Sequence, residues 1–112
     1  HTPTRRQRQM CIRDSADSIA AHVAIALAKN TPFQVNLNLC FDLEGVMING
    51  KLCEFFNPQD FMLAKKDGKV TGGMIPKLDL GFKAVQAGVR HVRIVHPKDL
   101  YTQTMGTYLR LD

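Results

Sequence analysis

Residues 71–95 read TGGMIPKLDLGFKAVQAGVRHVRIV, a pattern that predicts one helix followed by one strand. The apolar residues of the first half recur every three or four positions, so they share one face of a helix. These residues are Met74, Leu78, Phe82 and Val85. Gly88 is the residue type that most often follows the end of a helix. Residues 89–95 then carry the β-branched side chains that strands favour.

Upstream of this unit, the sequence predicts a strand and a hairpin. Apolar and polar residues alternate over residues 33–41, as in a strand that buries one face. The pair Asn49-Gly50 is a strong signal for a two-residue hairpin turn, with residues 46–48 and 51–55 as the two strands.

Two further helices and a last strand complete the predicted order. Asn57 is a favourable N-cap and Pro58 a favourable first residue for a helix that ends near Gly68. A longer helix with one apolar face is expected from Ala16 to Lys29, and residues 106–111 form the last strand. The residues assigned to the apolar face are Ile19, Ala20, Val23, Ile25, Ala26 and Leu27. Strands that alternate with helices predict an α/β fold built on a mostly parallel sheet.

Composition and charge are those of a globular protein. The 112 residues are 45% hydrophobic and 22% charged, and no apolar run reaches the roughly 18 residues that cross a bilayer. The net charge is +5, of which +3 falls in residues 1–15, where four arginines stand against one aspartate. This distribution argues against a nucleic-acid partner, and no pattern indicates a membrane partner. The three cysteines have no CxxC spacing, which favours reduced cytoplasmic thiols over a disulfide or zinc framework.

The N-terminal segment differs from the rest of the sequence. Residues 5–15, RRQRQMCIRDS, have neither helical nor strand periodicity, which is typical of a disordered basic arm. They also resemble, codon by codon, the translation of a transposon-type sequencing adapter. We therefore expect residues 1–15 to be an artefactual, disordered arm and residues 16–112 to be the domain, with the natural gene continuing upstream.

Three stretches carry residues that could act chemically. Asp17 lies at the start of the first expected helix, where the helix dipole favours a carboxylate in any case. Residues 41–47, FDLEGVM, follow the carboxyl end of a strand, where open α/β sheets bind ligands; a solvated turn is the other interpretation. Residues 71–77, TGGMIPK, place a glycine pair and Lys77 at a helix N-terminus, which favours phosphate. A glycine turn followed by a surface lysine explains this stretch equally well.

Taken in order, these stretches resemble the C-terminal portion of the acetylglutamate kinases, within the amino-acid kinase family. The resemblance covers residues 16–112 and is most specific in residues 72–77, GGMIPK. Ala87-Gly88-Val89 and Gly106-Thr107 near the end of the chain extend it. It implies the C-terminal, nucleotide-binding part of the amino-acid kinase fold, which is a partial three-layer sandwich with a mostly parallel sheet.

The resemblance also assigns roles to individual residues. Asp17 would orient the catalytic lysines, and Lys77 would be one of two lysines that stabilise the transferring phosphoryl group. The ATP-binding residues would be Asp42, Leu43, Glu44, Gly45, Val46 and Met47, together with Lys69, Val70, Thr71 and Met74. The sequence departs from the family at Arg13 and Ser15, where the family has asparagines, and it contains no Lys-x-Gly-Gly loop. We therefore expect that no acceptor-binding residue is retained and that the second lysine is missing.

The activity implied by the resemblance is transfer of the ATP γ-phosphoryl group to the side-chain carboxylate of an N-acylglutamate, a step of arginine biosynthesis. Such a carboxylate is ionised at neutral pH, so the reaction needs charge neutralisation rather than a general base. The expected partners are ATP, Mg²⁺ carried by the nucleotide and the N-acylglutamate, in a cytoplasmic homo-oligomer when full length. The fragment alone is expected to be inactive. The alternatives are an aspartate, glutamate 5-, uridylate or carbamate kinase, and a non-catalytic nucleotide-binding module.

Overall fold

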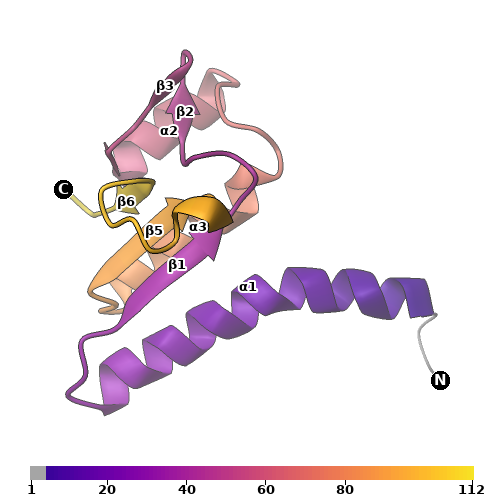
Figure 1. The fold of residues 1–112 in the computed structure, drawn as a ribbon, viewed down its shortest axis with the longest axis vertical. Helices are drawn as coiled ribbons and strands as arrows, with labels where there is room; N and C mark the ends of the chain where they lie inside the picture. The colour runs from indigo at the N-terminus through magenta and orange to yellow at the C-terminus, as the bar shows by residue number, and fades with distance from the viewer. Residues whose placement is uncertain (1–4) are drawn as a thin grey trace.

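The computed structural model describes the backbone of residues 5–112 and the side chains of residues 16–112. Its centre is a four-stranded sheet in the order β1-β5-β6-β4, and a hairpin of β2 and β3 stands apart from it (Figure 1). The strands are β1 (Asn36–Cys40), β2 (Met47–Ile48), β3 (Lys51–Leu52), β4 (Phe55–Phe56), β5 (His91–Val95) and β6 (Thr107–Leu109). β1 and β5 are parallel, as are β4 and β6, whereas β5 and β6 are antiparallel. The sheet is therefore mostly parallel, as the sequence predicts.

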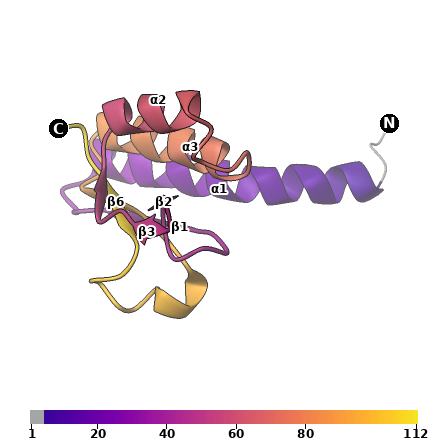
Figure 2. The same ribbon diagram turned by 90° about the horizontal axis from the view of Figure 1, so that it is seen from above.

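The helices lie on one side of this sheet. They are α1 (Arg5–Asn30), α2 (Pro58–Lys66) and α3 (Met74–Gln86). α1 and α3 lie side by side above the sheet with α2 next to α3, and the loop that contains the short 3₁₀ helix η1 (Pro97–Asp99) lies on the other side (Figure 2). The described residues thus supply the sheet and one helical layer of the expected sandwich. Within residues 5–112, no helix combines the length and apolar character needed to span a membrane.

The register of β1 and β5 decides which side chains face the helices. Leu37 pairs with Val92 and Leu39 with Ile94, and these side chains are buried under α3. The alternate residues of β1, Asn36 and Asn38, point to the opposite face and are exposed. The alternation predicted for residues 33–41 is confirmed over the five residues of β1.

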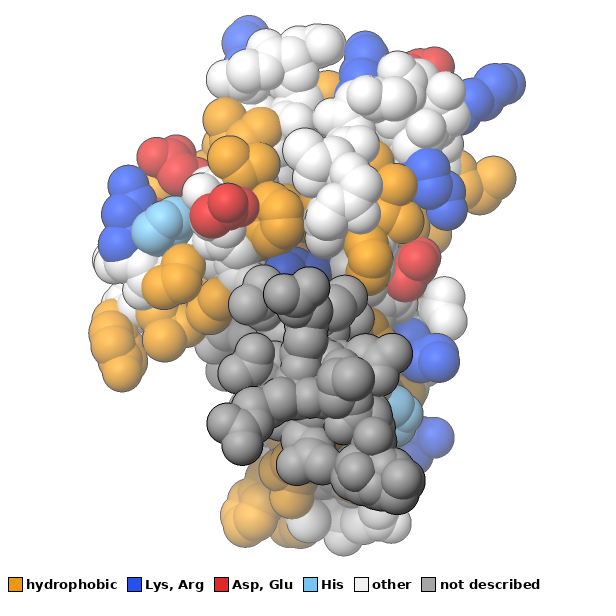
Figure 3. All heavy atoms as spheres, turned by 90° about the vertical axis from the view of Figure 1, so that its right-hand side faces the viewer, with side chains coloured by type: hydrophobic (Ala, Val, Ile, Leu, Met, Phe, Trp, Pro, Cys, Tyr) orange, Lys and Arg blue, Asp and Glu red, His pale blue; other side chains and the backbone are white. Residues whose placement is uncertain are grey.

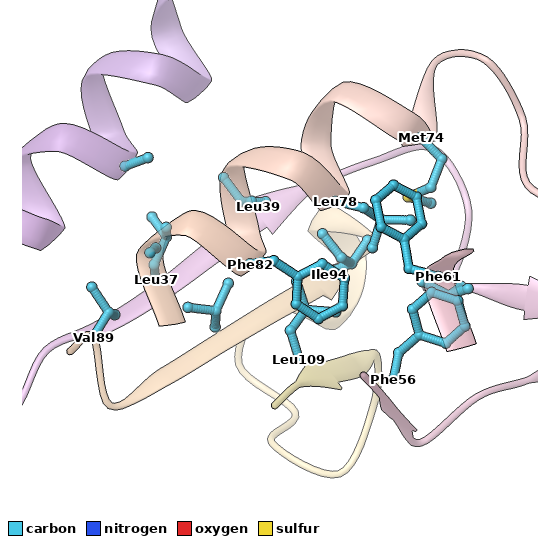
Figure 4. Packing of buried hydrophobic residues seen from close by; sticks show 14 of the residues in the cluster. Leu37, Leu39, Phe56, Phe61, Met74, Leu78, Phe82, Val89, Ile94 and Leu109 are labelled. Carbon is cyan, nitrogen blue, oxygen red and sulfur yellow. The ribbon is translucent and has the colours of Figure 1, made fainter. Parts of the chain in front are cut away.

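α3 supplies the centre of the core. Met74, Leu78 and Phe82 are buried as predicted, and Val85 is partly buried (Figure 4). Gly81 lets this helix approach the sheet closely, because a Cβ atom at this position would collide with Leu109. The helix ends as expected, with Gly88 in the left-handed region at φ 106°.

α1 buries a different face from the predicted one. Ala21 and Ala24 are buried, with Ile25 and Ala28 partly buried beside them, whereas most of the larger predicted residues point outward. The exposed fractions are 60% for Ile19, 51% for Val23 and 40% for Leu27. The prediction was wrong because two helices can approach more closely when small side chains lie between them. The alanine stripe therefore faces α3, and the larger residues are left outside.

The structure describes the N-terminal arm from residue 5 onward, by its backbone alone. The backbone of residues 5–15 continues α1 as a helix, and residues 1–4 lie outside the described part of the chain. Extending an existing helix is favourable compared with starting one, and arginine, glutamine and methionine are good helix formers. The disorder expected for residues 1–15 stays a prediction, since residues 1–4 and the side chains of residues 5–15 lie outside the described part of the chain. The artefactual origin of this segment and the domain boundary at residue 16 stay predictions.

The hairpin and the short helix follow the sequence closely, with one difference. Asn49 and Gly50 both have positive φ, 54° and 78°, as a two-residue hairpin turn requires. Asn57 caps α2 by accepting a hydrogen bond from Asp60 N at 2.7 Å. The predicted returning strand, residues 51–55, is divided: its first residues pair with β2, and Phe55 joins the four-stranded sheet as part of β4.

Candidate functional site

The predicted site segments meet where β1 ends. The segment of residues 41–47 directly follows β1. The first turn of α3 begins beside it, because a Cβ atom built on Gly73 would lie 3.6 Å from the Phe41 ring. α1 packs along α3 and brings Asp17 to the same end of that helix. This is the carboxyl edge of parallel strands, the position that ligands occupy in open α/β sheets.

Asp17 and Lys77 form a direct ion pair. The Lys77 ammonium donates a hydrogen bond to Asp17 Oδ2, although the two residues are 60 positions apart in the sequence. The Asp17 side chain is 30% exposed and the Lys77 side chain is 19% exposed, so the pair is partly shielded from solvent. The Phe41 ring lies on another side of the ammonium, with its centroid 5.9 Å from Nζ. A lysine held by a carboxylate and an aromatic ring has a defined position at the protein surface.

The first turn of α3 is closed by Thr71. Its hydroxyl accepts a hydrogen bond from Met74 N at 3.2 Å, and its carbonyl accepts from Met74 and Ile75 N–H groups at 3.1 and 3.3 Å. Pro76 has no N–H group. The donors left for an anion at this helix end are therefore the N–H groups of the glycine pair and the Lys77 ammonium.

A small hollow lies between this turn and the loop that follows β1. Its lining consists of Leu43, Val46, Met47, Lys69, Val70, Thr71 and Met74. All seven belong to the set predicted to bind ATP, and the tertiary structure brings them together from two segments. The hollow measures about 20 Å³, roughly the space of one water molecule. A purine base is too large to enter this hollow and would have to lie across its mouth.

The other predicted loop residues are placed outside the hollow. Asp42 is exposed. Glu44 forms an ion pair with Lys98 at 3.7 Å, on the loop after β5. Gly45 is buried, with no room for a side chain, because a Cβ would lie 2.6 Å from Thr107 Oγ1. The roles of these three residues in nucleotide binding stay predictions.

The surface around the carboxyl edge is mixed in charge. Figure 3 shows hydrophobic side chains gathered near the middle of this face, with acidic and basic side chains around them. In the described part of the chain, no group of three or more His, Cys, Asp or Glu side chains is placed where it could hold a metal ion.

Sequence reasoning missed Phe41, Lys98, Thr107 and Arg93. Phe41 carried a usable signal, as a large aromatic residue that ends a strand just before a predicted binding loop. Lys98 had none, and Thr107 stood out only as part of the Gly106-Thr107 pair of the resemblance, because their partners lie 54 and 61 positions away in the sequence. Arg93 is buried and donates hydrogen bonds to Asn38 Oδ1 and to the carbonyl oxygens of three loop residues, Leu100, Thr102 and Met105, at 2.6 to 3.1 Å.

A larger cavity of about 700 Å³ lies on the opposite face of the sheet, under the β5–β6 loop. Its walls include Asn38 and Arg93 from the strands and Tyr101 and Tyr108 from the loop and β6. It contains none of the predicted site residues. Asp17 and Lys77 are not among its lining residues.

The chain is similar in sequence to curated acetylglutamate kinases. An acetylglutamate kinase from Azobacteroides pseudotrichonymphae is 35% identical over 104 residues, which cover 89% of this chain and 40% of the relative. An acetylglutamate kinase from Cytophaga hutchinsonii is 36% identical over 107 residues, covering 88% of this chain and 40% of the relative. The chain is homologous to acetylglutamate kinases of the amino-acid kinase family. It spans about 40% of the length of these curated relatives.

Two solved structures superpose on most of this chain. The structure titled smu.665 from Streptococcus mutans UA159 superposes with a TM-score of 0.70 at 34% identity, over 87% of this chain and 36% of the other. Carbamate kinase from Giardia lamblia, bound to AMP-PNP, superposes with a TM-score of 0.64 at 21% identity, over 86% of this chain and 35% of the other. The second likeness shows the fold alone. No family model matches the chain.

The homology confirms the family resemblance and the α/β fold expected from the sequence. The structure places Asp17 against Lys77 and seven of the ten predicted ATP-binding residues around one hollow. The catalytic and binding roles of these residues stay predictions.

Proposed function

We propose that this chain forms the nucleotide-binding part of an acetylglutamate kinase, which transfers the ATP γ-phosphoryl group to the side-chain carboxylate of an N-acylglutamate in the cytoplasm. The observation that carries the proposal is the Asp17–Lys77 pair beside the lined hollow, at the carboxyl edge of β1. Homology to acetylglutamate kinases over most of the chain supports the choice of acceptor.

In the proposed site, the nucleotide would lie along the first turn of α3. The side chains that reach the mouth of the hollow, Leu43, Met47 and Val70, would contact the base, with the buried Val46 and Met74 behind them. The N–H groups of Gly72 and Gly73 and the Lys77 ammonium would point toward the phosphates, since a helix N-terminus and a lysine both favour negative charge. Mg²⁺ would be held mainly by the phosphates, because it keeps several waters and needs few protein ligands.

Lys77 has the chemistry that phosphoryl transfer requires. Its ammonium has three N–H donors, so it can keep its bond to Asp17 and still donate to phosphoryl oxygens. Charge on those oxygens is what a positioned cation stabilises during transfer. Asp17 would hold the ammonium in place rather than accept a proton. The acceptor carboxylate is already ionised, so no base is needed.

The proposal is tested with the complete gene product in an ADP-release assay. Its acceptors are N-acetylglutamate, N-succinylglutamate, glutamate, aspartate, carbamate and UMP. We expect turnover with one of the two N-acylglutamates and ATP. Turnover only with carbamate, aspartate, glutamate or UMP would assign another kinase of the family. ATP binding without any turnover would indicate a non-catalytic module.

A further inference from the structure

The hydroxyl group of Thr107 closes the base of the β2–β3 hairpin. Thr107 Oγ1 accepts a hydrogen bond from Val46 N at 2.8 Å and donates one to the Cys53 carbonyl at 2.5 Å. Val46 and Cys53 are themselves paired, with Cys53 N donating to Val46 O at 2.9 Å. One side chain from β6 thus joins the two ends of a segment that lies more than fifty positions away in sequence.

This contact is buried and closely fitted. Thr107 is 0% exposed and Val46 is 1% exposed, so water is kept from the Val46 N–H group, which depends on the hydroxyl as its acceptor. Gly45 packs against the same group, since a Cβ there would lie 2.6 Å from Thr107 Oγ1 and 3.1 Å from Thr107 N. A buried donor without an acceptor is costly, so the loop has little freedom to move away from Thr107.

The position of Thr107 is in turn set by the sheet. Its backbone pairs with Ile94, which is 0% exposed in the middle of β5. Gly106, with φ 89°, lets β6 begin next to that strand. The hydroxyl is therefore attached to a rigid part of the fold, whereas Val46 lines the hollow.

We infer that Thr107 is a positioning residue, which fixes the loop of residues 42–47 in the conformation that meets the nucleotide. This inference rests on the proposed function, because it assigns Val46 and its neighbours to the ATP site. Thr107 itself does not line the hollow and acts through Val46.

The test uses Thr107→Val, which keeps the shape and removes the hydroxyl, and Thr107→Ser, which keeps the hydroxyl. Thr104→Val is the matched control, because Thr104 is exposed in the loop before β6. Amide hydrogen exchange without nucleotide is measured at Val46 and at Ile94, and ATP affinity is measured by calorimetry. All variants are made in the complete gene product.

For Thr107→Val, we expect Val46 exchange to rise about tenfold or more relative to Ile94, and ATP binding to weaken by about tenfold. Thr107→Ser and Thr104→Val should stay within about threefold of the wild type in both measurements, since neither removes the hydrogen bonds. If Thr107→Ser bound ATP as weakly as Thr107→Val, the inference would be overturned. If Thr107→Val does not fold, a tenfold loss of ATP affinity in Thr107→Ser would overturn it as well.

The two proposals fail in different ways. If the wild type binds ATP and Thr107→Val binds it equally well, only the positioning role is wrong. Equal acceleration of exchange at Val46 and Ile94 would also overturn that role, because it would indicate general destabilisation. If the wild type binds no ATP, the proposed function fails, and the positioning role fails with it.

Discussion

Lys77 is the residue on which the proposed chemistry depends most directly. In the complete gene product, Lys77→Ala should lower kcat by about 10²–10³-fold with a much smaller change in the KM for ATP, because the lost charge acts mainly in the transition state. Lys77→Arg should restore activity only in part, since a planar guanidinium places its charge differently. Lys83→Ala on the exposed face of α3 is the matched control and should leave kcat unchanged. Steady-state kinetics decide this, and a near-normal kcat for Lys77→Ala would remove the residue from the mechanism.

Cys53, at the base of the hairpin, offers a prediction about pH. Burial and the nearby Asp60 carboxylate raise the pKa of this thiol above its ordinary value of 9.0, although a backbone hydrogen bond from Ile48 opposes the shift. The folded state therefore holds the thiol proton more tightly than the unfolded chain does. The thiol contributes stability that is present below pH 9.0 and is lost as the pH rises through the folded pKa.

The pH dependence of alkylation measures this shift, because its midpoint follows the thiolate population and not access to the thiol. At pH 8, iodoacetamide should modify Cys53 more slowly in the folded protein than in the denatured protein, because only the thiolate reacts. Asp60→Asn should raise the folded rate, since it removes the carboxylate charge but keeps an oxygen for the helix cap. Mass spectrometry of the modified peptide gives both rates. Equal rates in the folded and denatured protein would contradict the pKa shift.

At the scale of secondary structure, the fit of α3 on the sheet determines stability. Gly81→Ala should lower the free energy of unfolding by about 1–3 kcal/mol, because the added methyl group overlaps Leu109 and approaches Val92 to 3.3 Å. Gly72→Ala is the matched control, because a Cβ there meets no atom within 4 Å and should cost less than about 0.5 kcal/mol. Urea unfolding of both variants tests this. A Gly81→Ala variant as stable as the control would mean that α3 can move off the sheet without cost.

At the scale of the whole molecule, one catalytic lysine is not expected to be sufficient. A polypeptide of residues 1–112 should give no turnover with ATP and N-acetylglutamate, because it contains no Lys-x-Gly-Gly loop to supply the second lysine. An ADP-release assay on this polypeptide, beside the complete gene product, checks the prediction. Turnover of about 1–100 s⁻¹, the usual range for kinases, would show that Lys77 acts without a second lysine.

The sequence by itself determined the order of the elements, the mostly parallel sheet and the family. Local rules were enough for α3, where the spacing of Met74, Leu78 and Phe82 reports a face that is buried in the structure. They were also enough for the Asn49-Gly50 turn and the Asn57 cap, since each depends on neighbours within a few residues. The family resemblance supplied the remaining site residues.

Tertiary structure alone decided the features that depend on distant partners. α1 buries Ala21 and Ala24 rather than Val23 and Leu27, because the helix that it meets, α3, selects the side that can approach most closely. Likewise, the hydroxyl of Thr107 acquires its role only when β6 lies beside the hairpin base. Periodicity in a sequence records which side chains are apolar, but the partner surface determines which of them are buried and which polar groups meet.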